Sequence, residues 1–153
     1  MRLVVAAVGR PRNAALAAAI NDYETRAARY WPLDVVEVRE ERGSALSAAQ
    51  VRDREGARLI DKAGAARIVA CDPLGRSFTS EEFAEWLKRE RDSGRDAAFL
   101  IGGAHGLSTE VLDRAMMKLR LAPWTLQHEL ARLVLAEQLY RAGSILRNEP
   151  YHK

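Results

Sequence analysis

The sequence predicts an α/β fold in which a mostly parallel sheet is covered by helices on both faces. Short apolar segments alternate along the chain with longer segments of helical period, the order typical of such folds. The length of 153 residues corresponds to a single domain, and a hydrophobic content of 48% is enough to fill its core. In this class of fold, ligands gather beyond the carboxyl ends of the strands.

Five segments have the composition of strands. The first is a β-branched run, the second alternates apolar and polar residues, and the fourth is apolar throughout. The third is followed by Asp-Pro-Leu-Gly at 72–75, a sequence typical of a turn. The predicted strands are residues 2–8, 33–39, 67–71, 97–101 and 118–122.

Four of the five predicted helices begin beside a residue that can cap them. Asn13 precedes an alanine-rich segment, while Ser47 with Gln50 and Thr79 with Glu82 have the spacing of capping boxes. The predicted helices are residues 13–29, 47–63, 79–93, 109–117 (with Ser108 as the candidate cap) and 127–142.

Composition excludes several classes of protein. The longest aliphatic runs are far shorter than the roughly 18 residues that a membrane span requires, and Arg10 ends the first of them before a signal-peptide core is complete. A single cysteine, Cys71, allows no internal disulfide. The histidines, at 105, 128 and 152, are not spaced as metal ligands. We expect a cytoplasmic protein with no membrane segment and no metal.

The net charge of +3 is concentrated at the C-terminal end. Residues 1–113 hold 17 basic and 18 acidic side chains, whereas residues 114–153 hold 7 basic and 3 acidic ones. Twenty of the 24 basic residues are arginine, which pairs with phosphates and stacks on bases, so RNA is a plausible partner. A coding sequence rich in G and C would also favour arginine.

The segment Ile101-Gly102-Gly103-Ala104-His105-Gly106 follows the apolar fourth strand. It lacks the lysine of a P-loop and the spacing of a dinucleotide fingerprint. Three glycines at this place let the backbone approach a ligand or another segment closely. The two interpretations are a ligand-binding turn and a tight strand-to-helix connection.

The connection 121–126, Leu-Ala-Pro-Trp-Thr-Leu, is unusually apolar for a surface loop. A flat group such as adenine would fit against it, held by main-chain polar groups between aliphatic walls. A buried hinge beneath the last helix would explain the same composition.

The last predicted helix has apolar residues on more than one face, which favours a second subunit packed against it. Glu137 and Arg141 are spaced as a helix salt bridge. The tail contains Tyr151, His152 and Lys153, which suit stacking on a base and holding phosphate, although many chain ends only fray. By its position after an apolar strand, Cys71 suits a small core side chain better than a nucleophile.

Four motifs together resemble the RlmH family of small SPOUT-class methyltransferases that act on large-subunit rRNA. The resemblance extends over the whole length, with the motifs in the same order. They are Ile101-Gly102-Gly103-x-x-Gly106-Leu107-Ser108, Thr125-Leu126-x-His128-x-Leu130-x-Arg132, Ala136-Glu137-Gln138-Leu139-Tyr140-Arg141-Ala142 and Pro150-Tyr151-His152-Lys153.

The resemblance implies one SPOUT domain over residues 1–153, with a trefoil knot in its C-terminal part, an exception to the rule that chains avoid knots. It also implies a homodimer that binds S-adenosylmethionine in the knot, without a metal. The implied reaction is methylation of N3 of a pseudouridine in the 23S rRNA of assembled ribosomes.

The resemblance also assigns residues to the cofactor site. The family often has leucine in place of Cys71 and proline in place of Gln127, and both contacts are expected to be made through main chain and shape. The implied cofactor-binding residues are Cys71, Gly102, Gly103, Leu121, Ala122, Pro123, Trp124, Thr125 and Leu126.

Methylation of a pseudouridine N3 requires loss of its imide proton and stabilisation of the developing anion. Arg141, Tyr151 and His152 are the candidate catalytic residues. His152 suits a general base because the histidine pKa lies near neutrality, but an anion stabilised by arginine that loses its proton to water would also suffice. The RNA surface is expected to come from the C-terminal segments of two subunits.

Two other classes of function fit the residues taken without the resemblance. A non-catalytic regulatory module would bind an adenosyl ligand in the same pocket and leave RNA unmethylated. A ribosome-associated structural factor would use the glycine turn for packing and bind no adenosyl ligand.

Overall fold

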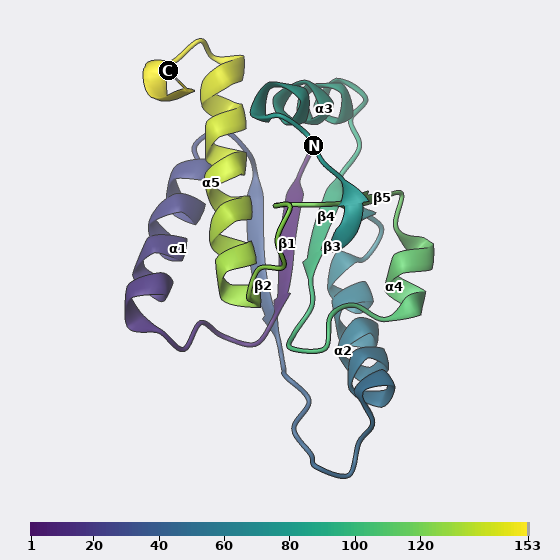
Figure 1. Ribbon diagram of the computed structural model, residues 1–153. Helices are drawn as coiled ribbons and strands as arrows, with labels where there is room; N and C mark the ends of the chain where they lie inside the picture. Colours follow the sequence, from purple (N-terminus) through teal and green to yellow (C-terminus); the bar gives the residue numbers. More distant parts are fainter. Residues whose placement is uncertain (153) are drawn as a thin grey trace.

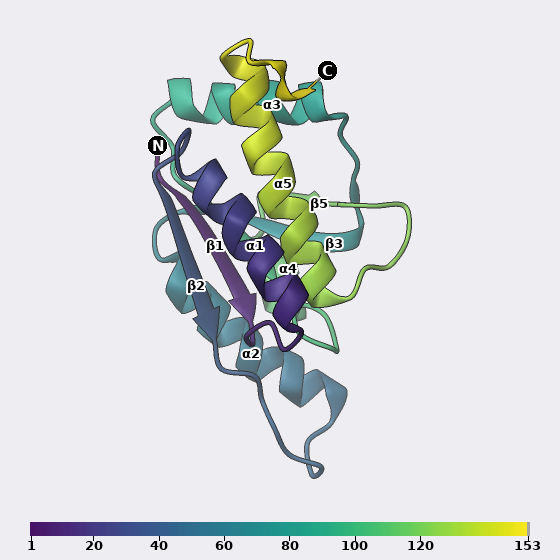
Figure 2. The same ribbon diagram turned by 90° about the vertical axis from the view of Figure 1, so that its left-hand side faces the viewer.

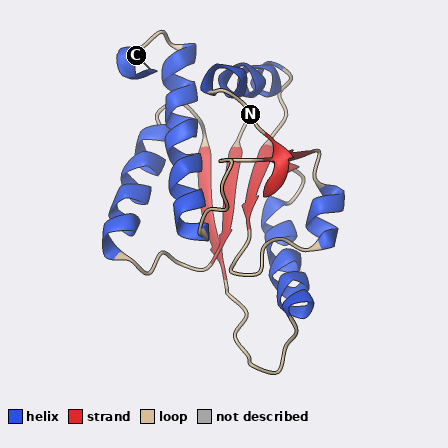
Figure 3. Ribbon diagram, viewed as in Figure 1, coloured by secondary structure: helices blue, strands red, loops and turns tan. Residues whose placement is uncertain are grey.

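The computed structural model describes the backbone of residues 1–152 and the side chains of residues 1–151. A five-stranded sheet has the strand order β2-β1-β4-β3-β5 (Figures 1 and 3). All of its strands are parallel, which confirms the predicted mostly parallel sheet. The strands are β1 (Leu3–Val8), β2 (Leu33–Val38), β3 (Arg67–Arg76), β4 (Ala97–Ile101) and β5 (Met117–Leu119). The helices are α1 (Ala14–Ala27), α2 (Ala48–Ala63), α3 (Ser80–Asp92), α4 (Thr109–Arg114) and α5 (His128–Leu146), followed by a 3-10 turn at Pro150–His152.

Helices cover both faces of the sheet, as predicted. Alternate residues of β1 point to opposite sides, so Leu3 and Val5 pack in one apolar cluster while Val4 and Ala6 pack in another. The first cluster includes residues of α1, α3 and α5, and the second includes residues of α2 and α4. In Figure 2, α1 and α5 lie side by side on the first face.

The predicted caps are present. Asn13, Ser47, Thr79 and Ser108 each accept a hydrogen bond from a backbone N–H in the first turn of the following helix. At Ser47 and Thr79 the return bond from the helix side chain is also formed, which completes both capping boxes.

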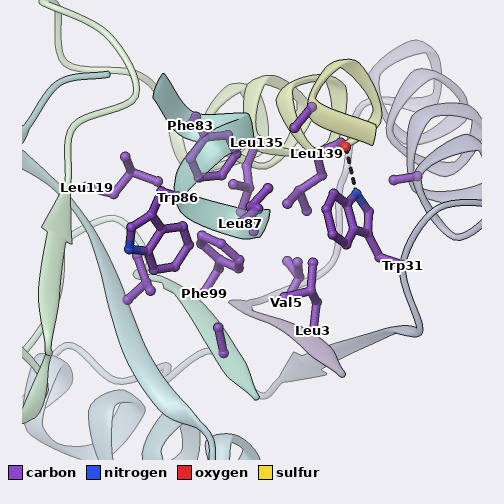
Figure 4. Close-up of a cluster of buried hydrophobic side chains, with 14 of the residues drawn as sticks. Leu3, Val5, Trp31, Phe83, Trp86, Leu87, Phe99, Leu119, Leu135 and Leu139 are labelled. Atoms are coloured by element: carbon purple, nitrogen blue, oxygen red, sulfur yellow. Dashed lines mark hydrogen bonds between the residues drawn. The ribbon is translucent and has the colours of Figure 1, made fainter. Parts of the chain in front are cut away.

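The larger core cluster is built around aromatic rings between the sheet and helices α3 and α5 (Figure 4). Phe83 stacks on Trp86 with 6.1 Å between ring centroids and meets the edge of Phe99 at 6.0 Å. The Trp31 indole donates a hydrogen bond of 2.9 Å to the Leu139 carbonyl. These contacts fix the position of α5 over the sheet.

Three elements near the end of the sheet have other boundaries than predicted. β3 does not stop at Cys71, because both Cys71 and Arg76 pair with Leu119 across an irregularity that makes the intervening residues bulge. α4 ends at Arg114 rather than 117, since the Met116 N–H donates 2.9 Å to the Ile68 carbonyl and draws the chain onto the sheet. β5 is correspondingly shorter and begins one residue earlier than predicted.

Arg132 on α5 forms a buried ion-pair cluster with two other elements. Its side chain is 7% exposed, and its Nε and Nη1 lie 2.7 Å and 2.8 Å from Glu24 on α1 and Glu37 on β2. A second bond, 3.2 Å long, joins Arg132 Nη2 to the other Glu24 oxygen. The cluster therefore fixes α5 against both α1 and the edge strand β2.

We expect Arg132→Met to lower the free energy of unfolding by about 3–5 kcal/mol, because it leaves two carboxylates in a partly buried site without their cation. Arg114→Met, which removes an exposed i,i+4 pair with Glu110, is the control and should cost about 0–1 kcal/mol. Urea denaturation of both variants measures the difference. Equal losses would show that the Arg132 cluster has no special role.

Candidate functional site

A cavity of about 520 Å³ lies at the carboxyl ends of β3, β4 and β5, where this fold class is expected to bind ligands. Its walls come from the glycine turn after β4, the connection after β5 and the first turns of α5. Eight of the nine predicted cofactor-binding residues line it. They are Cys71, Gly102, Gly103, Leu121, Ala122, Trp124, Thr125 and Leu126.

The glycine turn forms its part of the wall from backbone. The Gly106 N–H donates 3.0 Å to the Gly103 carbonyl, and Gly106 has a φ of +80° that other residues rarely adopt. A Cβ at Gly102 would lie 2.6 Å from the Gly106 carbonyl carbon. The turn is thus both a tight connection and the wall of a cavity, which joins the two interpretations of the sequence.

The connection after β5 lies at the surface, and Arg120 binds its backbone. Arg120 donates from Nε to the Ala122 carbonyl at 3.0 Å and from Nη2 to the Pro123 carbonyl at 2.9 Å. Trp124 is 77% exposed, so this segment is not the buried hinge that its composition also allowed. Pro123 does not line the cavity, and its contribution is to accept the Arg120 hydrogen bond.

Cys71 is a neutral wall residue. Its side chain is partly buried just before the bulge of β3, and removal from water raises the pKa of its thiol to about 12, with a further rise from the neighbouring Asp72. A thiol with so high a pKa is a poor nucleophile at neutral pH. Cys71 therefore shapes the cavity.

The predicted catalytic residues Arg141 and Tyr151 lie together at the other end of α5. Arg141 donates from Nε and Nη2 to Glu137 Oε1 at 2.9 Å and 2.7 Å, and its guanidinium lies 4.8 Å from the Tyr151 ring centroid. The Tyr151 hydroxyl donates 3.1 Å to the same Glu137 oxygen. The predicted salt bridge is present, and it also orders the tail. The side chain of His152 lies outside the described residues.

The charges in this cluster are fixed at neutral pH. The hydrogen bond to Glu137 raises the pKa of the Arg141 guanidinium. Burial, followed by hydrogen bonds to Tyr23 and Glu137, raises the pKa of Tyr151 well above its usual range. Arg141 is therefore a permanent cation, and Tyr151 is a neutral hydrogen-bonding group rather than a base.

The two groups of predicted residues are not brought together within one chain. Ala131 lines the cavity, and Arg141 follows it by ten residues on the same straight helix, which corresponds to about 15 Å along the axis. In Figure 1 the tail packs at the end of α5 opposite to the one that follows the β5 connection. Among the described residues, Arg141 and Tyr151 therefore lie apart from the cavity of the same chain.

The family described as predicted SPOUT methyltransferase matches residues 1–152. The chain belongs to this family. A ribosomal RNA large subunit methyltransferase H from Gemmatimonas aurantiaca is 60% identical over 154 residues and covers 100% of both chains. One from Anaeromyxobacter sp. strain Fw109-5 is 52% identical with the same coverage.

Among solved structures, the chain is similar to the SpoU methyltransferase AviRb from Streptomyces viridochromogenes in complex with AdoMet. The identity is 19%, the TM-score is 0.45, and the match covers 97% of this chain and 59% of the other.

A second cavity in this SPOUT methyltransferase is larger, about 810 Å³, and lies at the carboxyl ends of β1 and β2. Its walls are mostly charged side chains that pair with one another, such as Arg10 with Glu37 at 3.3 Å. A ligand with an apolar, flat part fits the smaller cavity better, because there aliphatic side chains and backbone form the walls.

Sequence reasoning missed several residues of this SPOUT methyltransferase site. Asp72 and Pro73 were interpreted only as a turn, yet they line the cavity because β3 continues past them. His128 also lines it from the start of α5, beside Gln127, for which the resemblance had already implied a contact with the cofactor. Arg120 had no recognisable motif, since its role depends on two carbonyls of a loop that folds back on it.

Other classes of site are not evident in the described part of the chain. No group of three or more histidine, cysteine or acidic side chains there could hold a metal ion. No helix there combines the length and apolar character needed to cross a bilayer.

We expect Arg120→Ala to release the connection 121–126, because two charge-assisted hydrogen bonds to its backbone are lost. Amide hydrogen exchange in that segment should accelerate, while exchange in β1 stays unchanged. Arg114→Ala, which removes an exposed arginine on α4, is the control and should leave the segment unaffected. Unchanged exchange in Arg120→Ala would contradict the role given to this side chain.

Proposed function

We propose that the protein transfers a methyl group from S-adenosylmethionine to N3 of a pseudouridine in the 23S rRNA of the assembled ribosome. The observation that carries the proposal is the cavity at the strand ends, whose walls are the predicted cofactor residues, in a chain of the SPOUT methyltransferase family. The full-length relatives named as large-subunit rRNA methyltransferases support the substrate class. Membership of an enzyme family favours catalysis over the two non-catalytic alternatives.

The cavity fits an adenosyl cofactor. Residues of the glycine turn and of the connection 121–126 line it, several of them aliphatic, and its volume of about 520 Å³ is ordinary for a small-molecule site. Gly102, Gly103 and Leu121 would hold the cofactor, with Leu126 as a further wall. S-adenosylmethionine, when bound, supplies an electrophilic methyl group.

The chain's own contribution to the reaction is to position the base and stabilise charge. Arg141 stays cationic, so it would favour the imide anion that forms when N3 loses its proton. Tyr151 keeps its proton and would orient the uracil face by hydrogen bonding or stacking. His152, whose side chain lies outside the described residues, or water would accept the proton.

The separation of cavity and tail supports a homodimer whose site is built from two chains. Among the described residues, the exposed large hydrophobic side chains are Leu74, Trp124 and Leu130. They come from the β3 bulge, the β5 connection and the first turn of α5, the three segments around the cavity. A partner that covers them would bring its own Arg141 and Tyr151 to the cavity mouth.

The remaining predictions about the chain follow from this function. One SPOUT domain over residues 1–153 is consistent with the family match to residues 1–152. A trefoil knot in the C-terminal part stays a prediction, and the tight packing of Gly75 on β5, where a Cβ would lie 2.5 Å from the Lys118 carbonyl carbon, is compatible with it. A free Cys71 thiol and an rRNA substrate favour the cytoplasm.

Methyl transfer can be measured directly on the natural substrate. Ribosomes from a strain that lacks this protein are incubated with the purified protein and S-adenosylmethionine carrying a labelled methyl group. We expect label on one large-subunit pseudouridine, at N3. Bound cofactor without labelled RNA would support the regulatory module instead. If the protein neither bound the cofactor nor labelled RNA, the assignment of the cavity would be contradicted.

Subunit mixing tests the composite site. Gly102→Val blocks the cavity, Arg141→Ala removes the tail cation, and each variant alone should be inactive. A site built across two chains predicts that co-expressed variants regain about a quarter of wild-type activity, because half of the dimers are mixed and each has one intact site. A site within one chain predicts no recovery. Activity of the wild type that persists after dilution to monomers would also contradict the composite site.

A further inference from the structure

Glu55 on α2 is a buried acidic residue directly behind the glycine turn. It is 2% exposed, although most glutamates lie at the surface. Its Oε1 accepts a hydrogen bond of 3.0 Å from the Glu41 N–H, in the loop that follows β2. Within the described residues its Oε2 has no hydrogen-bond partner, and no other buried side-chain nitrogen or oxygen there is without one.

The unpartnered oxygen occupies the space that a side chain at position 103 would need. A Cβ on Gly103 would lie 2.9 Å from Glu55 Oε2 and 3.1 Å from a methyl group of Val8. Gly103 is also one of the residues that line the cavity. A single residue of backbone therefore separates the buried carboxyl group from the cavity.

The next residue of α2 supports the other end of the same turn. A Cβ on Gly56 would lie 2.3 Å from Ser108 Oγ, and Ser108 is the buried cap of α4. The pair Glu55-Gly56 is thus the surface on which residues 103–108 rest. The position of the cavity wall depends on this contact.

We propose that Glu55 is a positioning residue for cofactor binding, whose buried carboxyl group supports the Gly102–Gly106 turn where its Oε2 packs against Gly103. The proposal rests on the function proposed above. Glu55 does not touch the cavity, so it acts through Gly103 and not on the cofactor itself.

The surroundings of Glu55 favour the protonated form. Burial raises the pKa of its carboxyl group, and the charge of Glu40 adds to the rise. The Glu41 N–H, Arg58 on the same helix and His105 in the glycine turn act in the opposite direction. A neutral carboxyl group can donate from one oxygen while the other accepts, which an ionised group cannot do.

The sign of the pH dependence follows from the raised pKa. A protonated Glu55 that supports the turn predicts that affinity for the cofactor is full at low pH and falls as pH rises through the raised pKa of the carboxyl group. Glutamine has the same shape and an amide that donates at every pH. Glu55→Gln should therefore bind well and lose this component of the pH profile.

Calorimetric titration with S-adenosylhomocysteine between pH 5 and 9 tests the proposal, with urea denaturation of the free protein alongside. We expect Glu55→Ala to lower affinity about tenfold at low pH, the size of one buried hydrogen bond, and Glu55→Gln to restore it with a flat profile. Asp53→Ala, an exposed position on the same helix, is the control and should keep the wild-type profile.

Two outcomes would overturn the inference. One is wild-type affinity and pH profile in Glu55→Ala, and the other is a pH profile in Glu55→Gln that matches the wild type. A wild-type protein that binds no S-adenosylhomocysteine would instead contradict the proposed cofactor. In that case hydrogen exchange of residues 102–108, expected to accelerate in Glu55→Ala but not in Glu55→Gln, decides whether Glu55 holds the turn.

Discussion

The ion-pair cluster of Arg132 is the constraint on which both parts of the site depend. It fixes α5 against α1 and β2 through two carboxylates from different elements. The first turns of α5 border the cavity, and its last turns order the tail through Glu137 and Arg141. A shift of this helix would therefore change the cavity wall and the position of the tail together. The hydrophobic core alone would not specify this orientation so closely, because apolar packing is not directional.

At the carboxyl edge of the sheet, the cavity exists because backbone takes the place of side chains. Gly75 lets the β3 bulge pack closely on β5, Gly102 lets the turn close on itself, and Gly103 leaves room for Glu55. The resulting wall exposes main-chain polar groups beside aliphatic surface, a combination that suits the sugar and base of an adenosyl group. The cationic chemistry lies elsewhere on the chain, at the far end of α5. This separation is the reason for proposing a site that is built from two subunits.

The sequence was sufficient for the parts of the fold that depend on local rules. Hydrophobic period located the strands and helices, and the caps at Ser47 and Thr79 formed as their spacing predicted. The continuation of β3 past Cys71 could not be predicted, because it depends on a pairing with β5 that only the tertiary fold provides. Eight of the nine residues that the resemblance assigned to the cofactor line the cavity. Neither source indicated Arg120, which binds a loop that folds back on it, or Glu55, which contacts the backbone of a distant loop. The distance between Arg141 and the cavity was not indicated either.

Titration of the purified protein with S-adenosylmethionine, followed by calorimetry, tests the central claim most directly. The cavity assigned here predicts one binding event per subunit, which Gly102→Ala should abolish because its Cβ would lie 2.6 Å from the Gly106 carbonyl carbon. Gly43→Ala is the matched control, since a Cβ there would meet only the Leu46 side chain at 3.8 Å. Absence of binding by the wild type, or equal binding by Gly102→Ala, would contradict the account.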